Sequence, residues 1–92
     1  MVKVIVEHKV RDFEAWKPVF DSSADLMKRY GGSNYDVGIV HGTKDDVYVT
    51  GDFESEKKFK EFMNLEELKN KMKESGVISE PKVTILEEKE RG

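Results

Sequence analysis

The sequence predicts an α+β fold in which the elements follow the order β-α-β-β-α-β. Three observations lead to this prediction. Apolar and polar residues alternate near both ends of the chain and in two stretches near its middle, which is the period of a strand. Between these stretches, apolar residues recur at spacings of three and four, which is the period of a helix. The 92 residues suffice for one domain, so we expect a single domain over 1–92.

The first strand and the first helix are predicted from the N-terminal third of the chain. Residues 2–10 alternate valines with lysine and glutamate, as a strand does. Asp12 can then accept hydrogen bonds from the free amides of a helix, and Gly31 is a residue type that ends one. Pro18 has no backbone N–H and lies past the first turn, so we expect the helix to kink or tighten there. The apolar face of this helix comprises Phe13, Trp16, Phe20, Ala24, Met27 and Tyr30.

A hairpin and a last strand account for the other alternating stretches. Residues 34–41 and 47–54 are separated by a short polar link, so they are expected to pair antiparallel. Pro81 precedes the last strand, which is predicted over residues 82–88.

The second helical region is predicted between Ser55, which can cap its first turn, and Gly76, which can end it. Its apolar residues lose helical phase at Asn64. Asn64 and Glu67 have the spacing of a capping box, so this region is expected to be two helices or one kinked helix.

These elements form a four-stranded antiparallel sheet with both helices on one face. The helix-facing residues are nearly all apolar: Val2, Val4, Val6, Val10, Tyr35, Val37, Ile39, Val47, Val49, Phe53, Val83 and Ile85. The opposite face is mixed and carries Ile5, Glu7, Val40, Tyr48, Thr50, Asp52, Thr84 and Leu86. A second copy of the chain laid over that face would cover its apolar residues and leave room for a partly polar cavity, so we expect a homodimer. The alternative is an exposed sheet face with scattered apolar residues, which is common on monomers.

Composition excludes several classes of protein. The net charge is −3 without a basic excess, which argues against a nucleic-acid binder. No stretch approaches the ~20 apolar residues of a membrane span, and the N-terminal stretch lacks the apolar run of a signal peptide, so a cytoplasmic protein is expected. The chain has no cysteine, its two histidines lack a metal-ligand spacing, and it has no cofactor fingerprint. We therefore expect neither a metal nor a cofactor.

Two groups of residues are candidates for a functional site. His8 lies on the valine side of the first strand and could be the acid–base group of a pocket bounded by Trp16 and Tyr35. The alternative is a histidine at the rim, bonded to nearby backbone. On the mixed face, Tyr48 and the carboxylates of Glu7 and Asp52 could contact a ligand, and a carboxylate in a cavity can serve as a general base. Each carboxylate could instead pair with a nearby lysine, of which the candidates are Lys3, Lys9 and Lys82.

Three segments, HKVRDFEAWKPVFDSSADLMKRYGG, DVYVTGDFES and FMNLEELKNKMKESGV, resemble small proteins of the dimeric α+β barrel superfamily, in the branch related to antibiotic-biosynthesis monooxygenases. The resemblance covers nearly the whole chain and lies mostly in features that shape the fold, such as Asp12, Trp16, Phe20 and the broken second helix. It implies a ferredoxin-like sandwich and a homodimer whose two sheets close into a barrel.

Activities in this superfamily are diverse, and they include cofactor-free oxygenation of polycyclic aromatics, haem degradation and lactone isomerisation. Haem-degrading members use an asparagine in the first strand and a histidine on the second helix, whereas this chain has Glu7 and His8 in the strand and no histidine in that helix. The oxygenases share a looser pattern, in which asparagine, tryptophan and tyrosine surround a flat substrate. In this chain Asn34, Trp16, Tyr35 and Tyr48 could form such a pattern. Two hypotheses follow: a cofactor-independent monooxygenase or cyclase acting on a small apolar or aromatic molecule, or a non-catalytic ligand-binding or dimerisation module.

Overall fold

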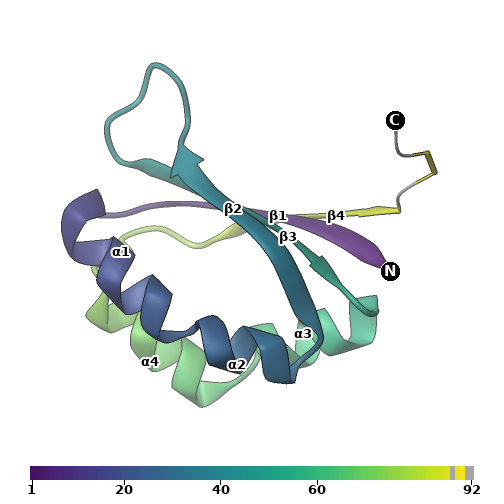
Figure 1. Cartoon of the computed structure of the whole chain (residues 1–92). Coiled ribbons are helices and arrows are strands. Elements are labelled where there is room, and N and C mark those ends of the chain that lie inside the picture. Colours follow the sequence, from purple (N-terminus) through teal and green to yellow (C-terminus); the bar gives the residue numbers. More distant parts are fainter. Residues whose placement is uncertain (88, 91–92) are drawn as a thin grey trace.

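The computed structural model describes residues 1–87 and 89–90, and it confirms the predicted element order with each helical region divided in two (Figure 1). The last residue of the predicted final strand, residue 88, lies outside the described residues. The elements are β1 (Val2–Lys9), α1 (Phe13–Ser22), α2 (Ala24–Arg29), β2 (Gly32–Ile39), β3 (Asp46–Phe53), α3 (Glu56–Met63), α4 (Glu66–Glu74) and β4 (Lys82–Glu87).

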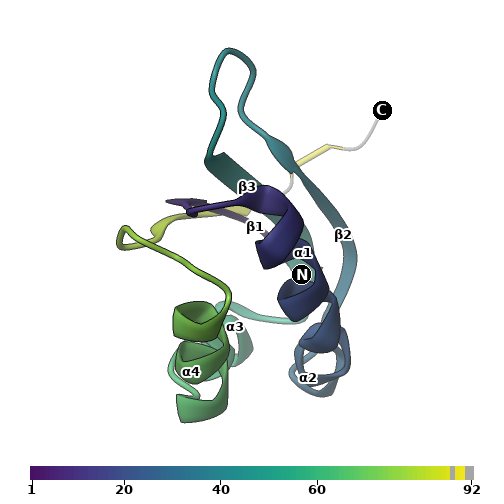
Figure 2. The same cartoon turned by 90° about the vertical axis from the view of Figure 1, so that its left-hand side faces the viewer.

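The strands form one antiparallel sheet in the order β2-β3-β1-β4, and the helices cover one of its faces (Figures 1 and 2). This confirms the ferredoxin-like α+β sandwich. The central pair aligns Val4 with Gly51 and Val6 with Val49, so these residues share the helix-facing side. Val10 was predicted to end the first strand but lies past it, where it forms an isolated bridge with Val77.

The first helical region breaks at Ser23, and not at Pro18 as we expected. α1 runs through Pro18 and ends at Ser22. The Ser22 hydroxyl donates to the Val19 carbonyl at 2.6 Å, and the Ser23 hydroxyl donates to the Phe20 carbonyl at 2.7 Å. Serine hydroxyls that bond back to carbonyls of the preceding turn compete with the helix backbone, which explains a break at this serine pair.

The predicted N-caps are confirmed, but the predicted capping box is wrong. The Glu14 amide donates to the Asp12 carboxylate at 3.3 Å, and the Lys58 amide donates to the Ser55 hydroxyl at 3.2 Å. At the second break, Asn64 ends α3 with helical backbone angles, whereas an N-cap needs an extended backbone. Leu65 is extended and takes the N-cap position of α4, without a side-chain hydrogen bond.

The helix-facing side of the sheet contains two adjacent groups of core residues. One surrounds the rings of Phe53, Phe59 and Phe62 beneath the middle of the sheet. The other consists of Val10, Trp16 and Val47, against which Phe13 and Phe20 pack. The candidate site lies where these two groups meet.

Candidate ligand-binding site

An apolar cavity lies between the sheet and the helices. β1 and β3 form its floor, and its walls come from α1 with α2 on one side and from α3 with α4 on the other. Figure 2 shows these two helix pairs diverging beneath the sheet. Its volume is about 70 Å³, measured as the space open to the centres of water-sized molecules. One water needs roughly 10–15 Å³ on this measure, so the cavity has room for about five waters, or a single aromatic ring.

The sheet side of the cavity is open because Gly51 has no side chain. Gly51 lies on the helix-facing side of β3 between Val49 and Phe53, and it lines the cavity. A Cβ atom at this position would meet its nearest neighbours, the Ser33 carbonyl oxygen and the Tyr35 Cβ, at 3.6 Å, which is ordinary contact. A Cβ atom would therefore fit at this position, and without one the cavity reaches the backbone of β3.

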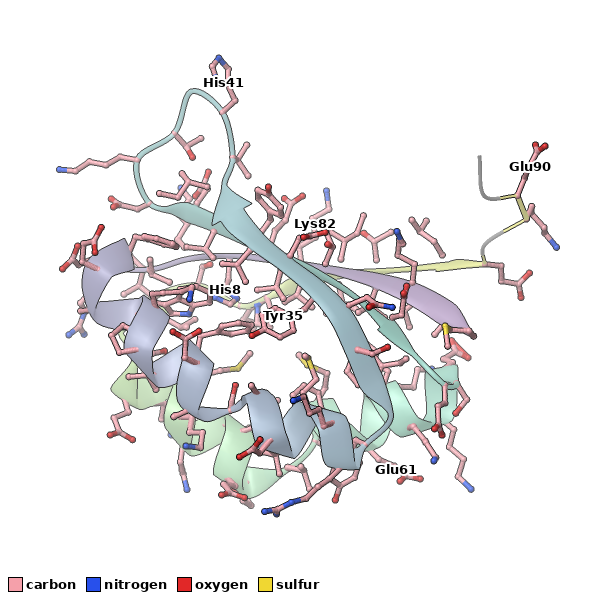
Figure 3. The ribbon with its side chains drawn as sticks, viewed as in Figure 1. His8, Tyr35, His41, Glu61, Lys82 and Glu90 are labelled. Atoms are coloured by element: carbon pink, nitrogen blue, oxygen red, sulfur yellow. The ribbon has the colours of Figure 1, made fainter. Side chains whose placement is uncertain are left out.

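His8 is the polar group at the inner wall of this cavity. Its side chain comes from β1 on the helix-facing side, lies between the sheet and α1 (Figure 3) and is 6% exposed. Its ring lies 5.8 Å from the Trp16 ring at an interplanar angle of 66°. Within the described part of the chain, neither Nδ1 nor Nε2 has a hydrogen-bond partner, so the alternative of a rim histidine bonded to backbone does not describe it.

Burial lowers the pKa of His8 below its ordinary value, because the charged imidazolium loses its hydration. The imidazole is therefore neutral at pH 7, with one N–H donor and one nitrogen acceptor. Buried polar atoms without partners are rare in proteins. A ligand in the cavity would supply partners for both nitrogens.

The other two predicted residues of this pocket differ in position. Trp16 lines the cavity, is 3% exposed and stacks on Phe20 with ring centroids 4.9 Å apart. Tyr35 is 37% exposed and is not among the lining residues. Its ring meets the edge of Phe20 at 5.5 Å, so it lies one ring further out than Trp16. The structure thus brings together His8 and Trp16, while Tyr35 supports the wall from behind.

Glu7, Tyr48 and Asp52 lie on the opposite face of the sheet, away from this cavity. Glu7 is aligned with Tyr48 on β3 and with Lys82 on β4, whereas Asp52 is aligned with Lys3 at the other end of β1. The two carboxylates therefore do not converge on one site.

Tyr48 and Asp52 are each packed against β2 on that face. A Cβ atom at Gly38, the cross-strand neighbour of Tyr48, would approach the Tyr48 hydroxyl oxygen to 2.6 Å, so the tyrosine ring covers this glycine. Asp52, a predicted ligand contact, is 4% exposed and accepts a hydrogen bond from the Asn34 amide at 3.3 Å. Asn34 reaches it because β2 bulges there, with a positive φ of 50° at Asn34.

Sequence reasoning missed several lining residues, among them Gly51, Lys71, Ser23 and Ser75, and it placed Thr50, which also lines the cavity, on the opposite face. Gly51 had a usable signal, because a lone glycine inside a strand often marks a close approach or an opening. Lys71, Ser23 and Ser75 had none, since their types are common on solvated helices. Lys71 reaches from α4 across to α1, where its ammonium donates to the Ser22 hydroxyl oxygen at 3.0 Å. Among the described residues, no group of three or more histidine, aspartate or glutamate side chains could hold a metal ion.

Comparison with known proteins supports the fold. No protein-family model matches the chain, and no curated protein matches it in sequence. Solved structures do match. SnoaB, a cofactor-independent oxygenase from Streptomyces nogalater, superposes with a TM-score of 0.76 at 8% identity, over 98% of this chain and 94% of that chain.

Two other solved structures agree with this match. An antibiotic biosynthesis monooxygenase superposes with a TM-score of 0.71 at 12% identity, over 96% of this chain and 98% of that chain. Rv0793 from Mycobacterium tuberculosis superposes with a TM-score of 0.72 at 16% identity, over 98% of this chain and 96% of that chain. The protein thus has the ferredoxin-like α+β fold of these antibiotic-biosynthesis-monooxygenase-like structures, in agreement with the fold that the resemblance implied. Identities this low establish the fold alone.

Proposed function

We propose that the protein is a homodimeric enzyme that binds a small, largely aromatic molecule in the cavity and removes a proton from it. The single observation that carries this proposal is His8, a buried imidazole on the wall of an apolar cavity whose two nitrogens have no hydrogen-bond partner among the described residues. Buried polar groups without partners are expected at sites where a ligand completes the hydrogen bonding. Trp16 beside it offers an aromatic surface for a ring.

Proton removal is the step that these residues can perform. The neutral imidazole can accept a proton from an acidic O–H or C–H group of the ligand at its unprotonated nitrogen. The resulting ligand anion can either react with oxygen or attack a carbonyl group in the same molecule. A cofactor-independent monooxygenase and a cyclase therefore share this first step, and SnoaB, which has the same fold, is described as a cofactor-independent oxygenase.

The proposed homodimer forms through the face of the sheet that the helices leave uncovered. Ile5 and Tyr48 are half-buried there, and Leu86 is an exposed large apolar residue at the β4 edge. Burying this apolar surface against a second copy contributes roughly 25 cal/mol for each Å² removed from water. A two-fold axis makes one such patch complementary to itself.

A binding screen with and without a blocked cavity tests the site. Small phenols and enolisable aromatic ketones are added to the wild type, to Gly51→Val and to Thr84→Val, and binding is followed by the shift of the melting temperature. Gly51→Val puts a side chain into the cavity, whereas Thr84→Val places valine on the opposite face of the sheet. We expect hits that bind the wild type and Thr84→Val but not Gly51→Val. Equal binding to all three proteins would show that the hits do not bind in the cavity.

Activity is tested with His8→Gln, which keeps a hydrogen-bonding side chain but cannot act as a base. Hydrogen–deuterium exchange at the acidic position of a bound ketone, followed by NMR, should be catalysed by the wild type and lost in His8→Gln. The second hypothesis, a non-catalytic binding module, is favoured by one observation: Tyr35, Tyr48 and Asn34 do not line the cavity beside His8. Under that hypothesis His8→Gln would bind the same hits and the wild type would exchange no faster than buffer.

A further inference from the structure

We propose that the cavity takes an organic acid with a single aromatic ring, whose carboxylate pairs with Lys71 at the rim. This inference rests on the proposed ligand cavity and specifies the class of molecule that fills it. Three features of the lining carry it: the distribution of charge, the supply of hydrogen-bond donors and the volume.

The charge of the lining has one sign. Among the described residues that line the cavity, Lys71 carries the one formal charge, and none is an aspartate or a glutamate. No ion pair joins Lys71 to an acidic side chain within the part of the chain that the structure describes, although Glu67 and Glu74 lie within one helical turn of it. Its ammonium is instead held by the neutral Ser22 hydroxyl. A ligand anion would therefore meet an uncompensated positive charge, and a ligand cation would be repelled.

The hydrogen-bond donors of the lining select the same chemistry. The Ser23 and Ser75 hydroxyls already donate to the Phe20 and Met72 carbonyls, at 2.7 and 2.8 Å. The protons that remain available include two of the Lys71 ammonium, whose third is donated to Ser22, the single N–H of neutral His8 and the indole N–H of Trp16. A carboxylate accepts hydrogen bonds and donates none, so it suits the lysine.

The position of Lys71 places this charge at the opening between the helix pairs. Its side chain is half-buried and spans from α4 to α1, so its stem lies against the apolar lining while the ammonium stays near solvent. The interior beside Trp16 and His8 has room for one aromatic ring, as its volume indicates. An aromatic ring inside and a carboxylate at the rim would fill both parts at once.

A matched pair of probes tests the proposal: 3-phenylpropanoate and its neutral amide, 3-phenylpropanamide. Affinities are measured by isothermal titration at pH 7.5 and low ionic strength for the wild type and for Lys71→Met, which keeps the length of the stem and removes the charge. Lys69→Met is the control, because Lys69 lies on the same helix and is exposed. We expect the acid to bind the wild type and Lys69→Met at least about tenfold more tightly than the amide, as one charge-assisted hydrogen bond implies.

In Lys71→Met the acid should lose this advantage while the affinity for the amide stays within about twofold of the wild type. If the amide binds the wild type as tightly as the acid, or if Lys71→Met keeps the preference, the organic-acid inference is overturned and the cavity itself stands. If neither probe binds the wild type, both the inference and the proposed ligand cavity are overturned. Retained binding of the acid to Gly51→Val would place the acid outside the cavity and would also overturn the inference.

Discussion

Replacing His8 with phenylalanine is expected to make the protein more stable at neutral pH. Each buried polar atom without a partner costs on the order of 1–3 kcal/mol, and neither ring nitrogen of His8 has a partner in the part of the chain that the structure describes. A phenyl ring fills a similar volume beside Trp16 without polar atoms, and swaps of this kind are tolerated in cores. We therefore expect a gain of at least about 1 kcal/mol in the free energy of unfolding. For a domain of this size, that gain raises the melting temperature by roughly 4–8 °C.

The stabilisation should grow as the pH falls. Burial lowers the pKa of folded His8 below its ordinary value of 6.5, so the unfolded chain takes up this proton at a higher pH than the folded chain does. The stability contributed by neutral His8 is fully present above pH 6.5 and is lost as the pH falls through the lower folded-state pKa. Phenylalanine does not titrate. The difference between His8→Phe and the wild type should therefore be smallest above pH 7 and should increase in acid.

The assay is urea unfolding of the wild type, His8→Phe and His41→Phe at several pH values and one protein concentration. His41 lies on the exposed hairpin loop (Figure 3), so its replacement should change the stability by no more than about 0.5 kcal/mol. A His8→Phe variant that is less stable than the wild type at pH 7.5 would refute the reasoning. So would a difference that does not change with pH, because His8 would then already be satisfied in the folded chain.

Three further predictions concern the core, the dimer and the absence of a metal. Trp16→Ala should lower the free energy of unfolding by about 3–5 kcal/mol, because it empties a buried aromatic site, and an unchanged urea midpoint would contradict this. Light scattering on a size-exclusion column should give the wild type a mass of about twice the 10.6 kDa of one chain. Tyr48→Lys should give a monomeric mass or fail to fold, while His41→Lys, which adds the same charge on the exposed loop, should remain dimeric; a monomeric wild type would remove the homodimer proposal. The purified protein should be colourless, and a chelator should leave its melting temperature unchanged; a Soret band or a chelator-dependent shift would show that a haem or metal site had been missed.

Local patterns were enough to predict most of the fold. Alternating valines placed β1, and Asp12 and Ser55 were correctly predicted as caps because a cap depends on a few neighbouring residues. The exact helix breaks were harder, because several residues compete at each one. At Ser23, two hydroxyls that bond back to the helix decided the position against Pro18. At the second break, Asn64 has helical backbone angles and Leu65 is extended, so Leu65 is the N-cap of α4.

The candidate site was only partly predictable, because a cavity depends on how separate elements pack. Alternation placed His8 on the helix-facing side of its strand, and the structure puts it there beside Trp16. Lysines occur at positions 69, 71 and 73 of α4, and no pattern in the sequence distinguishes the one that lines the cavity. That choice depends on how α4 packs beside α1, where Ser22 lies across the gap from Lys71.

The cavity above Gly51 and the imidazole of His8, which has no partner among the described residues, would both be accounted for by the proposed ligand. Both features cost stability, since a cavity forfeits packing contacts and a buried polar atom without a partner forfeits hydrogen bonds. Strain or cost at a functional site is commonly offset by stability elsewhere in the protein. A ligand that supplies both the missing volume and the missing hydrogen-bond partners accounts for the two costs together, whereas a purely structural role for His8 accounts for neither.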